Sequence, residues 1–176
     1  SFHYYEIASF FSHPKAQYCL GIMYYYGIGT KKSYKDAFYL FNLAEKTNLN
    51  AAYYLGYMYE NGKGVERNIS KAIMYYEKCA KKEETRFVLT IGDGFKRIKI
   101  HNKYYYQSKI NLCLIYLTEK DKINIELAEK YLREANFSQH PFAHYLYGIY
   151  YHYYLHQSEN AIEKLNMLTK IENKFY

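Results

Sequence analysis

The fold is decided by the stretch Ala51-Ala-Tyr-Tyr-Leu-Gly56-Tyr-Met-Tyr59-Glu-Asn-Gly62-Lys-Gly64. A second copy lies 35 residues earlier and reads Ala16-Gln-Tyr-Cys-Leu-Gly21-Ile-Met-Tyr24-Tyr-Tyr-Gly27-Ile-Gly29. Alanine, leucine, glycine, methionine and tyrosine recur in one register between the two copies. Agreement at one fixed period of this size is the signature of a chain built from stacked structural repeats.

Each repeat has the pattern of two helices joined by a glycine turn. Leucine, glycine, methionine and tyrosine recur at spacings that face one side of a helix with 3.6 residues per turn. Gly27 and Gly62 are predicted to end the first helix, since glycine tolerates the positive φ of a helix C-terminus. The second helix is expected to begin near Ser33 and Ser70, because serine hydroxyls suit the N-cap.

A glycine also recurs in the middle of the first helix, although glycine there costs about 1 kcal/mol relative to alanine. Gly21, Gly56 and Gly148 are therefore predicted to let another helix backbone approach closely. No single unit can bury its apolar stripe alone, so the units are expected to stack into a solenoid.

The repeat predicts a single all-α solenoid over residues 1–176. Its helix pairs are expected at about 14–46, 50–82, 104–136 and 141–172, after a leading helix at 1–10. The register breaks at residues 83–103, an insertion that is expected to be a degenerate helix or a projecting loop. Because the chain begins at Ser1 within a helical pattern, we expect it to be a piece of a longer protein.

The composition agrees with a helical protein that carries many tyrosines at surfaces and seams. There are 26 tyrosines and only 2 prolines, and proline breaks helices. The net charge of +7 raises the question of nucleic acid, but lysine and glutamate alternate on the same helical faces, which favours a solvated surface. Three cysteines are too few for a disulfide framework, and no apolar run reaches the length of a membrane helix.

If the first helix of each pair lines the concave surface, one stripe of side chains forms a groove. This aromatic and aliphatic stripe is expected to hold a peptide or helix of a partner protein, with tyrosines as anchors; the alternative is ordinary core between repeats. Its residues are Tyr18, Ile22, Tyr25, Tyr53, Tyr57, Glu60, Ile110, Leu114, Leu117, Tyr145, Ile149 and His152.

The insertion is basic and is therefore a candidate site for an anionic partner. Lys96, Arg97, Lys99 and Lys103 carry its positive charge. The alternative is a solvated loop with no ligand, which the sequence favours.

Signals for catalysis or metal binding are weak. Ser12 and Lys15 match the S-x-x-K of penicillin-recognising enzymes, but neither S-D-N nor K-T-G accompanies them. Histidines stand four residues apart at 140 and 144 and again at 152 and 156, without the glutamate of a zinc motif. The sequence thus indicates no catalytic residue, no metal and no cofactor.

The run A-x-x-x-L-G-x-M-Y-x-x-G-x-G, followed by K-A-x-x-Y-Y-x-K-x-A, resembles the Sel-1-like repeat, a relative of the tetratricopeptide repeat. It runs from Ala51 to Gly64 and from Lys71 to Ala80. The resemblance implies a right-handed superhelix of α-hairpins that scaffolds protein complexes. One member type is the lumenal adaptor of the ubiquitin ligase of endoplasmic-reticulum-associated degradation; others are bacterial signalling and host-interaction proteins. Cysteine-rich members are linked to β-lactam binding, but their paired cysteines are absent here.

Two glycosylation sequons begin at Asn68 and Asn136. They slightly favour the endoplasmic reticulum lumen, although about one sequon is expected by chance in this composition. Four hypotheses stay open at this point: a lumenal scaffold, a cytosolic or bacterial scaffold, an anion-binding module at residues 95–103, and an enzyme.

Overall fold

A computed structural model describes residues 2–10, 13–81, 83–90, 94–101, 103–136, 145–146, 148–150 and 152. The chain divides into two compact units, Ser1–Ser108 and Lys109–Tyr176. The predicted fourth helix pair, at 141–172, falls almost entirely outside the described residues.

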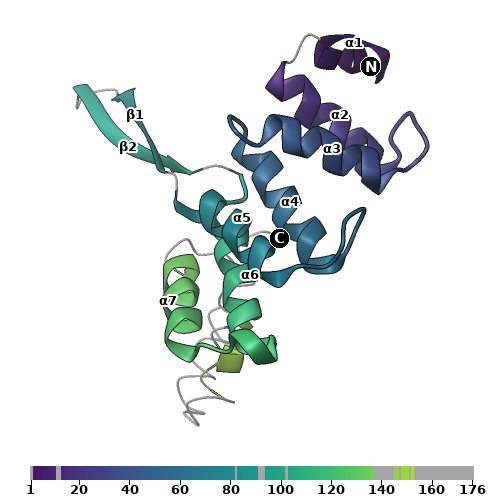
Figure 1. The fold of residues 1–176 in the computed structure, drawn as a ribbon. Helices are drawn as coiled ribbons and strands as arrows, with labels where there is room; N and C mark the ends of the chain where they lie inside the picture. The colour runs from purple at the N-terminus through teal and green to yellow at the C-terminus, as the bar shows by residue number, and fades with distance from the viewer. Residues whose placement is uncertain are drawn as a thin grey trace, which may run out of the picture. The chain divides into compact units, whose positions relative to one another are not determined.

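The first unit contains two helical hairpins preceded by a short helix (Figure 1). Helix α1 spans Phe2–Phe10 and packs on α2. Helices α2 (Pro14–Tyr26) and α3 (Tyr34–Ala44) form the first hairpin, and α4 (Leu49–Asn61) and α5 (Ile69–Lys81) form the second. The two hairpins are joined by packing of α3 on α4. Each of these two hairpins thus has the order of elements typical of the repeat, a helix, a turn with glycine and a second helix.

Polar side chains cap these helices as helix chemistry requires. The Ser33 hydroxyl accepts a hydrogen bond from the Asp36 amide at 3.3 Å and so caps α3. The cap of α5 differs from the expectation, because Asn68 Oδ1 accepts from the Lys71 amide at 2.9 Å and Ser70 lies inside the helix. Asparagine is as good a cap as serine, and it comes two residues earlier in the chain.

The mid-helix glycines make room for rings, which corrects the expected close approach of a helix backbone. A Cβ on Gly21 would lie 2.7 Å from the Phe41 ring, and a Cβ on Gly56 would lie 2.9 Å from the Tyr76 ring. Phe41 and Tyr76 have no exposed surface. Each glycine thus accepts a buried aromatic side chain from the second helix of its own hairpin.

The insertion folds as a β-hairpin, neither the degenerate helix nor the projecting loop expected. Strands β1 (Glu83–Thr90) and β2 (Gly94–His101) pair antiparallel, with Glu83 opposite His101 and Thr90 opposite Gly94. The ladder satisfies the backbone groups that a loop of this length would leave to water.

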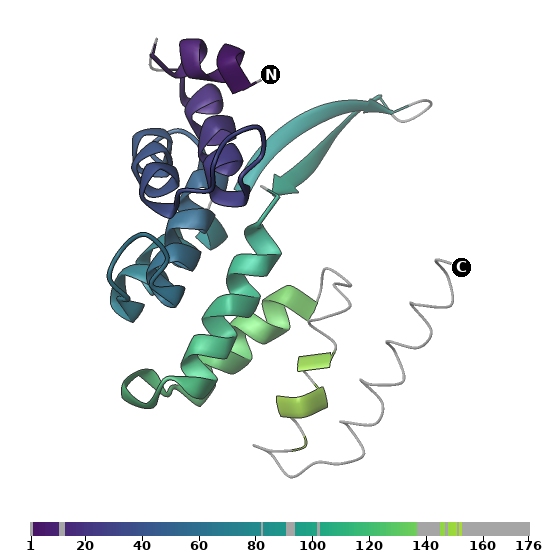
Figure 2. The ribbon, with the colours of Figure 1, turned by 90° about the vertical axis from the view of Figure 1, so that its right-hand side faces the viewer.

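The second unit is built around the part of α6 (Tyr105–Thr118) from Lys109 on and around α7 (Ile125–Asn136), and the two helices lie side by side in Figures 1 and 2. A short 3-10 turn, Lys120–Lys122, connects them. Tyr116 and Tyr131 stack with ring centroids 6.0 Å apart, and the Lys109 ammonium lies 2.7 Å from a Glu134 carboxylate oxygen. These contacts join the two helices of a third hairpin.

Candidate functional site

The first unit has a cavity of about 750 Å³ between side chains of its two hairpins. Tyr26 and Ile28 at its margin are more than half exposed, so the cavity opens to solvent. Its lining consists of eight tyrosines, three lysines and two isoleucines: Tyr18, Ile22, Tyr25, Tyr26, Ile28, Lys32, Tyr34, Tyr53, Tyr54, Tyr57, Lys63, Lys103 and Tyr104.

The first helix of each hairpin supplies most of this lining. Tyr18, Ile22 and Tyr25 follow one another at helical spacing along α2, and Tyr53 and Tyr57 do so along α4. The structure therefore brings together five of the six groove residues that the sequence singled out in these two repeats. The sixth, Glu60, is not among the lining residues, because its carboxylate accepts a hydrogen bond from the Tyr76 hydroxyl at 2.6 Å.

The later groove residues are not gathered in the same way. Ile110 has no exposed surface and Leu117 is buried, so both belong to the core of the second unit and not to an open groove. Leu114 and Ile149 are half-buried, whereas Tyr145 and His152 are exposed. Burial is the physical reason for the correction at Ile110, since a helix in a solenoid packs on neighbours over more than one face.

A chain of tyrosine hydroxyls runs along the cavity. The Tyr54 oxygen lies 3.3 Å from the Tyr26 oxygen and 3.2 Å from the Tyr104 oxygen, within hydrogen-bond distance of both. Burial and the hydrogen bond with Tyr104 raise the pKa of Tyr54 and of Tyr18 above the ordinary value. The hydroxyls of Tyr54 and Tyr18 therefore keep their protons, and with them their capacity to donate, at pH values above the ordinary pKa of tyrosine.

Lys63 is held among aromatic rings. Its Nζ donates to the Tyr25 hydroxyl at 3.3 Å and lies 4.8 Å from the centroid of Tyr57 and 5.7 Å from that of Tyr34. Burial lowers the pKa of Lys63, but the hydrogen bond and the electrostatic attraction to Tyr25 and Tyr57 outweigh it and the pKa is raised. Lys63 is thus a fixed positive charge at the cavity.

Sequence reasoning missed several members of this lining, among them Lys63, Lys32, Tyr34, Tyr54 and Tyr104. A signal for Lys63 was present, because it fills the variable position of Gly-x-Gly, where the preceding repeat has Ile28, and both side chains line the cavity. Tyr104 stacks on Tyr53 with centroids 4.2 Å apart and an interplanar angle of 4°. The contact joins a residue before the insertion to a residue after it, and no local sequence pattern predicts such a contact.

The other sequence candidates are separated by the structure. Of the expected anion patch, Lys103 lines the cavity, whereas Lys96, Arg97 and Lys99 lie on strand β2 with side chains outside the described residues. Asn68 is exposed in the loop before α5. Asn136 ends α7, and its side chain, like Ser12 and the histidines at 140, 144 and 156, lies outside what is described.

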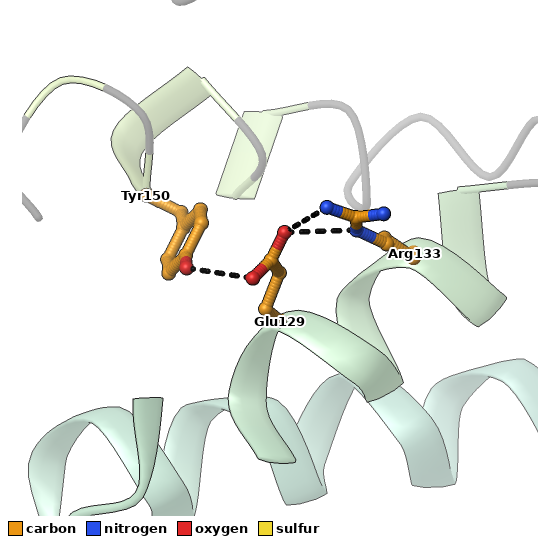
Figure 3. Close-up of polar contacts among 3 residues, drawn as sticks. All are labelled: Glu129, Arg133 and Tyr150. Atoms are coloured by element: carbon orange, nitrogen blue, oxygen red, sulfur yellow. Dashed lines mark hydrogen bonds and ion pairs between the residues drawn. The ribbon is translucent and has the colours of Figure 1, made fainter. Parts of the chain in front are cut away.

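In the second unit, Glu129 forms polar contacts with Arg133 and Tyr150 that hold the structure together (Figure 3). Glu129 accepts from Arg133 Nε at 2.8 Å and from the Tyr150 hydroxyl at 3.3 Å. Tyr150 is 1% exposed, so this carboxylate ties a buried tyrosine to α7. The guanidinium compensates the carboxylate charge, and the group offers no unpaired acid or base for chemistry.

Within the described ranges, no three histidine, cysteine or acidic side chains gather as ligands of a metal ion. No helix in the described part of the chain is long and apolar enough to cross a membrane. None of the three cysteines, all of which lie in the described part of the chain, forms a disulfide, and Cys79 and Cys113 are fully buried.

A family model for the Sel1 repeat matches residues 14–46, 49–83 and 107–136, more than half of the chain. The chain therefore belongs to the Sel1 repeat family, which confirms the resemblance seen in the repeated segment. Membership gives it the fold of a protein–protein interaction scaffold.

Individual relatives agree with this assignment. The human Protein sel-1 homolog 2 is 43% identical over 63 residues, which is 35% of this chain and 9% of that protein. A solved structure of a protective antigen from uropathogenic Escherichia coli with an SLR fold matches with a TM-score of 0.75 and 21% identity, over 96% of this chain and 33% of the other. A Sel1 repeat protein from Oxalobacter formigenes matches with a TM-score of 0.71 and 22% identity, over 96% of this chain and 62% of the other. These structures confirm the expected fold class, an α-α superhelix of helix hairpins.

Proposed function

We propose that the chain is a scaffold segment that binds a partner protein in the tyrosine-lined cavity of its first two repeats. The observation that carries this proposal is the cavity itself, about 750 Å³ and lined by eight tyrosines. Tyrosine offers a large contact area at low entropic cost together with a hydroxyl for hydrogen bonding. The site acts by binding, and no catalytic step is assigned to it.

Photo-crosslinking from within the cavity tests this proposal. A photoreactive phenylalanine analogue replaces Ile22, which lines the cavity, in the full-length protein expressed in its own cells. The matched control carries the analogue at Tyr39, which is 64% exposed and is not among the lining residues. We expect a defined protein to be captured from position 22 and not from position 39. Capture of the same proteins from both positions would count against the cavity.

A placement in the endoplasmic reticulum lumen, within a degradation ubiquitin-ligase complex, is the second candidate. The observation in its favour is the exposure of Asn68 in the sequon Asn68-Ile-Ser70. Because Asn68 also caps α5, the sequon is best removed by Ser70→Ala, which leaves the cap in place.

The measurement is the electrophoretic mobility of the full-length protein before and after enzymatic removal of N-linked glycans. A shift that Ser70→Ala reduces supports the lumenal placement, and copurification of a ubiquitin-ligase subunit supports the complex. No shift for the unaltered protein supports the cytosolic or bacterial scaffold instead.

A further inference from the structure

The charge of the cavity lining indicates which class of ligand the cavity binds. Lys32, Lys63 and Lys103 are among its lining residues, and none of the described lining residues is acidic. Elsewhere in the described part of the chain lysines do meet carboxylates, as Lys78 meets Glu45 and the buried Lys109 meets Glu134. The lining of the cavity therefore carries a net positive charge.

Lys63 has the geometry to contact an anion directly. The hydroxyl of Tyr25 accepts one of its hydrogen bonds, and Tyr57 lies under its ammonium. An ammonium has three hydrogens, and the hydroxyl oxygens of Tyr25 and Tyr57 accept at most two of them. One hydrogen is thus left to donate to a ligand. The rings of Tyr57 and Tyr34 lie beside the ammonium and hold it at the cavity, where Lys63 is half-buried.

The donors and apolar residues of the lining also indicate which class of anion the cavity binds. Arginine clusters bind phosphate and carboxylate groups through two parallel hydrogen bonds, whereas a lysine ammonium binds an anion as a point charge. No arginine is among the described lining residues, whereas single ammonium and hydroxyl donors are present. Such separate donors suit a carboxylate, and Ile22, Ile28 and the ring faces suit an apolar neighbour beside it.

On this basis, and resting on the proposed function of the cavity, we propose that its occupant is an acidic peptide segment of a partner protein. A Glu or Asp carboxylate of that segment lies against Lys63, and an adjacent apolar side chain lies against the isoleucines and tyrosine rings.

Binding of synthetic peptides to the full 176-residue chain tests the proposal. The probes are three fluorescein-labelled peptides of about ten residues in which leucine alternates with Glu, with Gln or with phosphoserine. Fluorescence anisotropy measures the affinity of each, and the photoreactive analogue at position 22 reports whether the peptide sits in the cavity. We expect the Glu peptide to bind about tenfold more tightly than the Gln peptide, as the loss of one charge-assisted hydrogen bond predicts.

Variants then assign the preference to Lys63. Lys63→Gln is expected to abolish the preference for Glu over Gln, and Lys63→Arg to keep it. The matched control, Lys46→Gln, removes the same charge from an exposed position that is not among the lining residues and is expected to leave the preference for Glu over Gln in place.

Three results would overturn the acidic-peptide assignment: equal affinity for the Glu and Gln peptides, a preference that survives Lys63→Gln, or tighter binding of the phosphoserine peptide. If the Glu and Gln peptides bound equally and both crosslinked from position 22, the cavity would still be an interaction site. Only the preference for a carboxylate would be rejected. The proposed function is judged separately, by capture of a partner in cells.

Discussion

Gly21 and Gly56 lie inside helices, where glycine costs about 1 kcal/mol relative to alanine. The cost is offset by the packing that glycine permits, because a methyl group at either position would overlap a fully buried ring. Phe41, opposite Gly21, is completely buried and stacks on Tyr54 with centroids 5.0 Å apart. A single hydrogen in place of a methyl group thus sets the spacing of the two helices in a hairpin.

Gly21→Ala is therefore predicted to destabilise the protein despite the better helix propensity of alanine. Overpacking costs about 1–3 kcal/mol and the propensity gain returns about 1, so we expect a net loss of about 1–2 kcal/mol in the free energy of unfolding. Urea denaturation measures it. In a Phe41→Leu background the same substitution should cost less, because the ring it meets is gone; an equal cost in both backgrounds would contradict the explanation.

The buried tyrosines and Cys113 predict a loss of stability in alkali. Burial raises the pKa of Tyr54 above its ordinary value of 10.0 and that of Cys113 from 9.0 to about 12. Both groups are neutral when protonated, so the stability they contribute is complete below the unfolded pKa and falls as pH rises above it. Each group lowers the free energy of unfolding by up to about 1.4 kcal/mol per pH unit.

Urea midpoints between about pH 8 and pH 11 measure this loss. Cys113→Ala is expected to remove the part that begins near pH 9 and to leave the tyrosine part, which begins near pH 10. A midpoint that stays constant up to pH 11 would contradict the assignment of buried neutral groups.

At the scale of elements, the Gly-x-Gly loop ties one hairpin to the other. Gly62 and Gly64 both have positive φ, of 66° and 71°, in the loop that carries Lys63. A Cβ on Gly62 would meet its nearest atom at 3.6 Å, whereas a Cβ on Gly64 would collide with the backbone carbonyl of Tyr34 in the preceding hairpin. The second glycine thus allows contact between repeats as well as the turn itself.

This pair of glycines gives a matched prediction. Gly62→Ala should cost about 1–2 kcal/mol, the price of a left-handed backbone for a residue with a side chain. Gly64→Ala should cost more, because the loop must also withdraw from Tyr34, and it should weaken peptide binding by displacing Lys63. Thermal or urea denaturation compares the two variants, and equal costs would refute the role of the second glycine.

The elements differed in how far the sequence could predict them. Helical hairpins were predictable because the 35-residue period repeats the contact of a mid-helix glycine with a buried ring, Gly21 with Phe41 and Gly56 with Tyr76. The β-hairpin was missed although Ile98 and Ile100 alternate with Arg97 and Lys99, a period of two that is typical of a strand and is short beside the helical repeats on either side of it. The stripe along α2 and α4 was predictable from helical geometry, but Tyr104 reaches the cavity only through the path of the chain beyond the insertion.

At the scale of the whole molecule, the net charge of +7 acts on an acidic partner before contact is made. Charges outside the cavity contribute to a long-range field that raises the association rate, whereas Lys63 acts only at contact distance. The Debye length falls from about 10 Å at 0.1 M salt to about 3 Å at 1 M, so salt removes the first effect far more than the second. The two contributions can therefore be separated by kinetics.

Stopped-flow measurement with the Glu peptide is expected to show this separation. Raising the salt from about 0.05 to 0.5 M should slow association by about tenfold and change dissociation little. Replacing two exposed lysines outside the cavity, Lys35→Gln and Lys46→Gln together, should slow association at low salt only. Lys63→Gln should instead speed dissociation at every salt concentration, because it removes a contact made in the bound state. If Lys63→Gln altered only the association rate, Lys63 would be one more contributor to the field, and the carboxylate contact would be rejected.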